Sequence, residues 1–213
     1  MSFAALIDYG MGNLRSVANA LEKAGAALRI VSSPEEAEGA SGVILPGVGN
    51  FGDGMKNLNQ SGFSEFVLRT VKSGKPFLGI CLGMQMLLDT SEEAPGVKGL
   101  GVFHGTVRRF PSGREEKVPH MGWNEITHDG SNPFLKGVPS GSHVYFVHSY
   151  YADPADKSVV AAECEYMFPF AAALSRGNVF ASQFHPEKSQ KCGMAILKNF
   201  VEAYQKYGGE RTC

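Results

Sequence analysis

A cysteine between two glycines is the sharpest candidate for catalysis in this sequence. It stands in Gly79-Ile80-Cys81-Leu82-Gly83, where an apolar run that begins at Pro76 gives way to a predicted helix. This G-x-C-x-G pattern is typical of a nucleophile held on a tight strand-to-helix turn. The helix dipole there favours a thiolate, and the N–H of Leu82 would point at the same place. Cys81 is therefore a candidate nucleophile, and a small buried core residue is the alternative interpretation.

A histidine and a glutamate two residues apart form the second candidate for chemistry. They stand in Phe184-His185-Pro186-Glu187. A proline biases the residue before it toward an extended backbone, and residues two apart in an extended segment face the same side. Glu187 can therefore reach the imidazole of His185 and fix the tautomer and orientation of a histidine base. The alternative is a surface loop with an ordinary ion pair, but together with Cys81 the motif supplies a base and its orienting group.

A glycine-rich segment, residues 46–54, directly follows a predicted strand. Ligand-binding loops of open α/β sheets lie at the carboxyl ends of the strands, where this segment is expected. Such a loop can present its backbone N–H groups to an anion or an oxyanion. A plain turn is the alternative interpretation.

The remaining motifs argue against a cofactor or a metal ion. Gly10-Met11-Gly12 lacks the third glycine of a dinucleotide fingerprint, because that position is Arg15. Trp123, the single tryptophan, lies in a predicted loop over residues 119–124, as either a core residue or an interface anchor. The other histidines show no metal-ligand spacing, and most are expected to be structural or exposed: His104, His120, His128, His143 and His148. We therefore expect neither a metal ion nor a cofactor.

The first half of the chain alternates between buried strands and amphipathic helices. Strands that alternate with helices imply right-handed crossovers and a mostly parallel sheet. The apolar patterns predict strands at residues 3–7, 28–31, 42–45 and 76–80, and helices at residues 14–21, 63–71 and 82–88.

The second half of the chain has a different pattern. Short apolar runs joined by turns indicate an antiparallel extension of the sheet or a meander, and an amphipathic helix follows at residues 194–204. The predicted strands are residues 102–110, 144–147, 159–162, 171–174 and 179–183. Because no linker or repeat interrupts the chain, we expect one domain over residues 1–213.

Composition places the chain among globular proteins. Of its 213 residues, 43% are hydrophobic and 19% are charged, which excludes a disordered chain. Lys and Arg number 20 against 21 Asp and Glu, and the signs are mixed locally, as in residues 114–117. A nucleic-acid-binding protein usually shows a basic excess, so that class is disfavoured.

No segment predicts a membrane span or a targeting signal. The apolar run at residues 3–7 is short and stops at Asp8, and the longer run at residues 167–174 contains Pro169. The four cysteines match neither a metal pattern nor a disulfide scaffold: Cys81, Cys164, Cys192 and Cys213. We therefore expect reduced thiols in a cytoplasmic protein.

Together, the motifs resemble those of the class I (triad) glutamine amidotransferases. Residues 79–85 resemble the nucleophile motif of that family, and residues 184–187 resemble its second signature. More narrowly, the chain resembles the glutaminase subunits of imidazole glycerol phosphate synthases in segments 46–55, 91–97, 119–125, 146–150 and 185–189. The resemblance implies a flavodoxin-like α/β fold, with a mostly parallel central sheet flanked by helices and an antiparallel extension.

The resemblance also implies a role for each site residue. Cys81 would form a thioester with glutamine, His185 would protonate the departing ammonia and then activate water, and Glu187 would hold His185. The N–H groups of Leu82 and Val48 would form the oxyanion hole. Contacts to glutamine would come from Gly49, Gln85, Glu93, His148, Ser149 and Tyr150, and interface contacts from Asn13, Trp123, Tyr145 and Lys188.

The partner implied by the resemblance is a cyclase subunit with a (β/α)₈ barrel, bound in a heterodimer. It would use the ammonia to make imidazole glycerol phosphate and an aminoimidazole carboxamide ribotide. Three alternatives stay open. They are the glutaminase subunit of another synthase, such as pyridoxal 5′-phosphate synthase, a cysteine peptidase or thiol hydrolase of related fold, and a binding module without catalysis.

Overall fold

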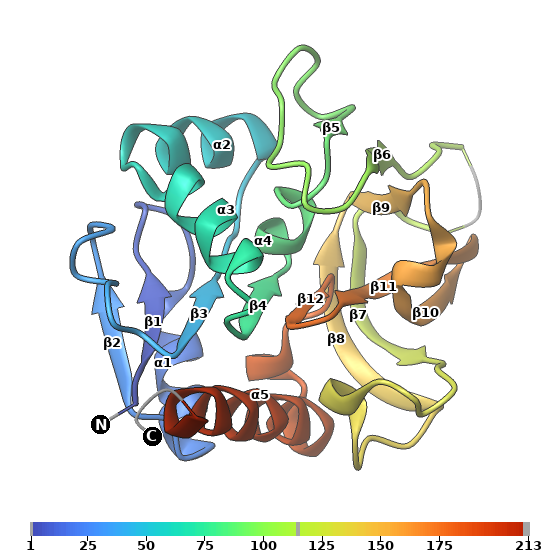
Figure 1. The fold of residues 1–213 in the computed structure, drawn as a ribbon. Helices are drawn as coiled ribbons and strands as arrows, with labels where there is room; N and C mark the ends of the chain where they lie inside the picture. Colours follow the sequence, from blue (N-terminus) through green and yellow to red (C-terminus); the bar gives the residue numbers. More distant parts are fainter. Residues whose placement is uncertain (1, 114–115, 211–213) are drawn as a thin grey trace.

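A computed structural model describes residues 2–113 and 116–210 of the chain. Cys213 and residues 114 and 115 of the mixed-charge segment therefore lie outside the described residues. The described part is built around a ten-stranded sheet (Figure 1).

Five strands of this sheet are parallel, as the alternation of strands and helices predicted. They run in the order β2-β1-β3-β4-β12. Their bounds are β1 Ala4–Ile7, β2 Leu28–Val31, β3 Gly42–Leu45, β4 Phe77–Ile80 and β12 Val179–Ser182.

The sheet continues beyond β12 in a mainly antiparallel extension, which confirms the prediction for the second half. The order is β12-β11-β9-β6-β5, and β10 pairs with β11. The strands are β5 Thr90–Ser91, β6 Gly105–Arg109, β9 Tyr150–Pro154, β10 Val160–Tyr166 and β11 Phe168–Arg176. A separate antiparallel pair consists of β7 His120–Ile126 and β8 Ser142–His148.

Helices cover both faces of the parallel strands (Figure 1). In β1, Ala4 and Leu6 pack in one apolar cluster with α1 and α5, whereas Ala5 and Ile7 pack in another with α2 and α3. Strands that are buried on both faces have continuous apolar runs in their sequence. The helices are α1 Leu14–Lys23, α2 Phe51–Gln60, α3 Phe63–Lys72, α4 Leu82–Gln85 and α5 Gln190–Glu210, with short 3₁₀ turns η1 Pro133–Leu135, η2 Lys157–Val159 and η3 Pro186–Lys188.

Two segments predicted as loops differ in the structure. Residues 119–124 contribute most of β7. Its exposed positions carry the apolar Met121 and Trp123, so the sequence lacks the alternation of apolar and polar residues that is typical of a strand with one exposed face. The glycine-rich segment 46–54 is a loop only as far as Asn50, because α2 begins at Phe51. The Asn50 side chain caps this helix by accepting the N–H of Asp53 at 2.8 Å, and Phe51 is buried. The cap and this burial outweigh the low helix propensity of the glycines in α2.

Some element boundaries also differ from the predictions, and one strand of the extension, β9, was not predicted. The helix predicted at residues 82–88 is the short α4, and the strand predicted at 102–110 begins only at Gly105. Strand β9 was not predicted, because its sequence carries Asp153 and Pro154 at an end of the strand.

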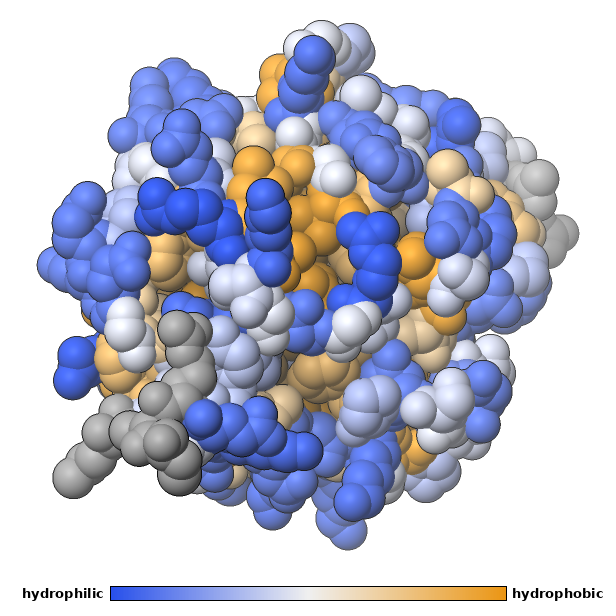
Figure 2. All heavy atoms as spheres, viewed as in Figure 1, coloured by the Kyte–Doolittle hydropathy of each residue, from blue (hydrophilic) through white to orange (hydrophobic). Residues whose placement is uncertain are grey.

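The surface is mainly hydrophilic on the face shown in Figure 2, with hydrophobic side chains gathered near its centre. Among the described residues, the large hydrophobic side chains classed as exposed are Ile30, Val48, Leu68, Met121 and Trp123. None of the helices in the described part of the chain is long and apolar enough to cross a membrane.

Candidate active site

Cys81 stands on a sharp turn between β4 and α4. Its backbone has φ 54° and ψ −107°, a left-handed conformation that is strained for a residue with a side chain. The Cys81 N–H donates to the carbonyl of Ser182 on β12 at 2.7 Å, and the Cys81 carbonyl accepts N–H groups of α4. The structure therefore has the strand–turn–helix context that the G-x-C-x-G pattern requires.

The glycines of this motif allow close packing. A Cβ at position 83 would lie 2.0 Å from the carbonyl oxygen of Leu45 on β3. A Cβ at position 79 would lie 3.1 Å from Cβ of Ala181 on β12. Neither site accepts a side chain without movement of its neighbours, so the glycines hold the turn close to the two flanking strands.

His185 follows β12 and is held by Glu187 from the η3 turn. His185 Nδ1 lies 2.8 Å from Glu187 Oε1, and the two side chains are only 3% and 1% exposed. Because a carboxylate accepts, Nδ1 carries the proton of this bond, and His185 Nε2 has no hydrogen-bond partner among the described residues. Burial lowers the pKa of His185, but the interactions with the Cys81 thiol and the Glu187 carboxylate outweigh it and raise the pKa to about 10.

Cys81 and His185 open onto the same cavity, which has a volume of about 330 Å³. Glu187 lies behind His185, outside the lining. All the other residues expected in catalysis, the oxyanion hole or glutamine binding line this cavity, together with Pro119 and Val147: Val48, Gly49, Cys81, Leu82, Gln85, Glu93, His148, Ser149, Tyr150 and His185.

The loop after β3 packs tightly beside the cysteine turn. The hydroxyl of Tyr9 donates to the carbonyl of Pro46 at 2.9 Å. A Cβ at Gly47 would lie 2.7 Å both from that hydroxyl and from Cβ of Leu82. Gly49 has φ +103°, whereas the φ of Val48 lies outside the left-handed region. This loop and α4 therefore form one side of the cavity.

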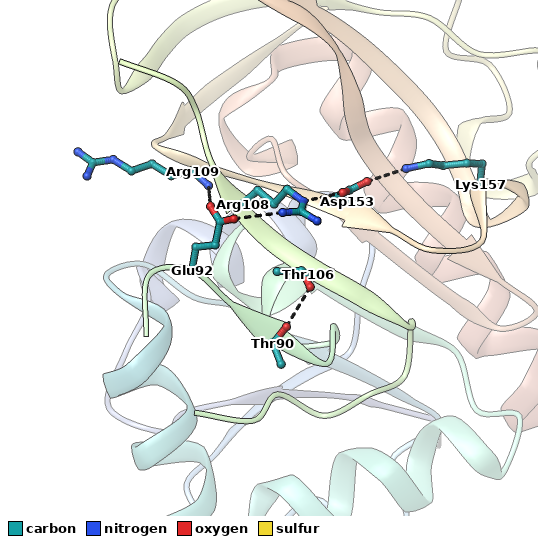
Figure 3. Close-up of polar contacts among 7 residues, drawn as sticks. All are labelled: Thr90, Glu92, Thr106, Arg108, Arg109, Asp153 and Lys157. Atoms are coloured by element: carbon teal, nitrogen blue, oxygen red, sulfur yellow. Dashed lines mark hydrogen bonds and ion pairs between the residues drawn. The ribbon is translucent and has the colours of Figure 1, made fainter. Parts of the chain in front are cut away.

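Glu93 is held at the cavity by the N-terminus of α2. Its Oε2 accepts the N–H of Phe51 at 2.8 Å, which leaves the other carboxylate oxygen for a ligand. The neighbouring Glu92 binds outward, accepting from Arg108 Nη1 at 3.2 Å and from the Arg109 N–H at 2.9 Å (Figure 3). Arg108 in turn contacts Asp153, and each exposed ion pair alone stabilises little. The network keeps the second carboxylate, Glu92, away from the cavity.

Gln183 contacts the cysteine and was missed by the sequence analysis. Its Nε2 lies 3.7 Å from Cys81 Sγ, and its Oε1 accepts from Gln85 Nε2 at 3.0 Å. Gln183 stands two positions before His185 in an extended segment, and that spacing could have indicated a side chain on the same side.

The four expected interface residues do not line the cavity. Trp123 is 46% exposed, which excludes the core interpretation, and its ring meets that of Tyr145 edge-on at 6.1 Å. Lys188 Nζ lies 5.6 Å from the centre of the Tyr145 ring. Asn13 caps α1 by accepting the N–H of Ser16 at 3.3 Å. Trp123, Tyr145 and Lys188 thus form one cluster, which we call the Trp123 cluster.

Comparisons with known proteins agree with this geometry. A family model described as glutamine amidotransferase class-I matches residues 5–203. The chain is 51% identical over 207 residues to the imidazole glycerol phosphate synthase subunit HisH of Geobacter sulfurreducens, covering 95% of this chain and 99% of the relative. It is 52% identical over 200 residues to the HisH subunit of Geobacillus kaustophilus, covering 92% and 94% of the two chains.

Solved structures show the same fold. A crystal structure of a glutamine amidotransferase has a TM-score of 0.74 at 23% identity, over 94% of this chain and 98% of that one. The crystal structure of a putative GMP synthase subunit from Thermoplasma acidophilum has a TM-score of 0.75 at 20% identity, over 100% and 98% of the two chains. With the family model and the relatives above, these matches show that the chain belongs to the class I glutamine amidotransferase family.

Proposed function

We propose that this chain works as the glutaminase subunit of an imidazole glycerol phosphate synthase through a thioester on Cys81. One observation carries the mechanism: Cys81, on its strained turn, shares a cavity with His185, which Glu187 holds at 2.8 Å. This arrangement supplies a nucleophile, an acid and base, and an orienting group. The family model of glutamine amidotransferases supports glutamine as the substrate, and the relatives that are about half identical over nearly the whole chain are imidazole glycerol phosphate synthase subunits.

The reaction has two halves. Cys81 attacks the side-chain amide carbon of glutamine as a thiolate, and the resulting tetrahedral intermediate collapses when His185 gives its Nε2 proton to the departing ammonia. The neutral imidazole then takes a proton from water, which attacks the thioester, releases glutamate and restores the cysteine. Glu187 keeps the Nδ1 proton in place throughout and so leaves Nε2 as the group that exchanges protons.

The cavity lining supports a binding mode for glutamine. The Glu93 carboxylate attracts the α-ammonium group, and Gly49, Gln85, His148, Ser149 and Tyr150 surround the rest of the substrate. The N–H groups of Leu82 and Val48 stabilise the oxyanion of the intermediate.

A cyclase subunit with a (β/α)₈ barrel is the proposed partner, in a heterodimer that channels ammonia. Val48, which lines the cavity, and Met121 and Trp123 on β7 are exposed apolar side chains that a partner can cover. An aromatic anchor ringed by polar groups is typical of protein interfaces. The Trp123 cluster and Asn13 would contact the partner, which converts the ammonia to imidazole glycerol phosphate and aminoimidazole carboxamide ribotide.

The thiol is tested with Cys81→Ala in the complex with the cyclase. Glutamine-dependent synthesis should be lost, whereas synthesis from added ammonium salts should continue, because the cyclase reaction does not need the thiol. A glutamine-like electrophile should label Cys81 once per chain in the unmodified protein.

The other described thiols serve as internal controls for this labelling. Burial raises the pKa of Cys164 to about 12, so that it stays an unreactive thiol. Labelling at Cys164 or Cys192 instead of Cys81 would contradict the mechanism. Glutamate release that is not enhanced by the cyclase would indicate that the chain serves a different synthase. Cleavage of peptides would indicate a peptidase.

A further inference from the structure

Two buried histidines on the β7–β8 pair contact each other beside the cavity. His120 and His148 stand opposite each other in the strand register, and they are only 3% and 6% exposed. His120 Nδ1 lies 2.9 Å from His148 Nε2. His148 lines the cavity, whereas His120 is not among its lining residues.

The direction of this hydrogen bond follows from the groups at its two ends. His148 Nδ1 lies 2.8 Å from the carbonyl oxygen of Tyr150, which can only accept, so Nδ1 carries the proton. At the other end, Asn124 Nδ2 donates to the carbonyl of Glu165 at 2.9 Å, and Asn124 Oδ1 accepts the N–H of Glu125 at 2.8 Å. These bonds set the orientation of the Asn124 amide.

The same Asn124 Nδ2 lies 3.3 Å from His120 Nε2, so that nitrogen must accept. A neutral His120 then has its proton on Nδ1 and donates it to His148 Nε2. Both rings therefore carry a single proton on Nδ1, which is the less common tautomer of histidine in water. A second proton on either ring would place two donors against each other.

The surroundings of His120 keep it neutral and in place. Its ring is stacked between Phe146, at 4.7 Å between centroids, and Tyr166, at 4.0 Å. Burial lowers the pKa of His120 to about 4 and that of His148 to about 3.

The chain of hydrogen bonds ends on the wall of the cavity. The carbonyl of Tyr150 also accepts from Gln85 Nε2 at 3.0 Å, and Gln85 in turn contacts Gln183 beside Cys81. We propose that His120 is a positioning residue that holds the tautomer of His148 and, through the Tyr150 carbonyl, the glutamine-binding wall. This role deepens the proposed glutaminase function and rests on it.

The first test replaces His120 by phenylalanine in the complex with the cyclase. His120→Phe keeps an aromatic ring between Phe146 and Tyr166 but leaves the buried acceptor His148 Nε2 unpaired. We expect the KM for glutamine to rise about tenfold, within the range for a buried group without its partner. Synthesis from ammonium salts should be unchanged, because the cyclase reaction does not use this wall.

Two further variants separate positioning from simple packing. Tyr166→Phe removes only the hydroxyl bond to the carbonyl of Lys117 and should leave the KM unchanged. His120→Asn gives up the stacked ring but restores an N–H donor near the place of Nδ1, and it should recover part of the lost glutamine affinity. A KM in His120→Asn as high as in His120→Phe would mean that a donor at this place does not restore glutamine binding, and it would overturn the proposal.

Nitrogen NMR of ¹⁵N-labelled imidazoles in the unmodified complex tests the tautomers directly, even if a variant does not fold. His120 and His148 should both show a protonated Nδ1 and an unprotonated Nε2 at pH 7. A proton on Nε2 of His148, or an unchanged KM in folded His120→Phe, would refute the role of His120. Glutamate release by the unmodified chain would still support the glutaminase function in that case. Absence of that release would refute the function itself.

Discussion

At the level of single residues, reactivity at Cys81 coincides with backbone strain. A left-handed conformation costs a residue with a side chain roughly 1–3 kcal/mol, so the rest of the structure must stabilise it. The N–H of Cys81 is bound to Ser182 on the neighbouring strand, and the glycine at position 83 admits the carbonyl of Leu45. The strain therefore serves to present the thiol at the surface of the cavity.

The buried His120 and His148 should make the protein less stable in acid. Burial lowers the pKa of His120 to about 4 and that of His148 to about 3, whereas an unfolded histidine titrates near about 6.5. Between these values the unfolded chain binds more protons, so the free energy of unfolding falls as the pH falls from about 6.5 toward 4. Each histidine contributes up to about 1.4 kcal/mol per pH unit in that window.

Urea unfolding at pH 7 and pH 5 measures this effect. His120→Phe should lose less stability between the two pH values than the unmodified chain does. His143→Phe is the matched control, because the His143 side chain is 58% exposed, and it should lose as much as the unmodified chain. Equal losses in all three proteins would show that His120 does not titrate as described.

At the level of elements, the loop between β3 and α2 has little conformational freedom. Gly47 has no room for a Cβ, and Tyr9 holds the carbonyl of Pro46. We propose that the peptide between Gly47 and Val48 rotates to present the Val48 N–H as the second oxyanion donor. That rotation would push the φ of Val48 positive, which costs a β-branched residue on the order of 1–3 kcal/mol. Binding of the cyclase and its ligand could favour the rotated form and so activate the glutaminase.

Substitutions at Val48 test this regulation through glutamate release with and without the cyclase complex. Val48→Gly should relieve the strain and raise the activity of the isolated subunit, roughly tenfold for each 1.4 kcal/mol recovered. Val48→Pro removes the N–H and should stay slow even with the partner, since one oxyanion donor is worth about 10²–10³ in rate. Full stimulation of Val48→Pro by the partner would exclude this N–H as the second donor.

At the level of the whole molecule, the site lies where three adjacent parallel strands end. The loop with Val48 follows β3, Cys81 follows β4, and His185 lies beyond the end of β12. These strands are neighbours in the order β3-β4-β12, although β12 is about a hundred residues distant in sequence. More of the lining comes from the end of β8, the start of β9 and Pro119 just before β7, so both halves of the chain are needed for one cavity.

The exposed Trp123 on β7 leads to a prediction about subunit binding. Trp123→Ala should weaken cyclase binding by about 2 kcal/mol or more, as expected for an aromatic anchor. The thermal midpoint of the isolated chain should stay the same, because Trp123 is 46% exposed. Ile30→Ala on the edge strand β2 is the control, with similar exposure at 50% but no place in the Trp123 cluster. Titration calorimetry and thermal unfolding measure both quantities, and lost stability with unchanged affinity would contradict the anchor role.

The sequence by itself determined the local features of this protein. Continuous apolar runs marked β1, β3 and β4, because strands buried on both faces leave no polar positions. The glycines around Cys81 and the spacing of His185 and Glu187 indicated their geometry, since a tight turn and an extended segment depend on neighbouring residues alone. These patterns predicted a parallel sheet, an antiparallel extension and the candidate nucleophile, base and orienting group.

Only the tertiary structure decided the features that depend on distant pairing. Strand β7 escaped prediction because its exposed positions carry the apolar side chains of Met121 and Trp123 instead of polar ones. His120 and His148 are 28 residues apart, and their contact arises only because β7 and β8 pair in one register out of several. Gln183 reaches Cys81 only because β12 lies beside β4. Packing between distant elements determines which of these residues come into contact, and local sequence patterns do not indicate such contacts.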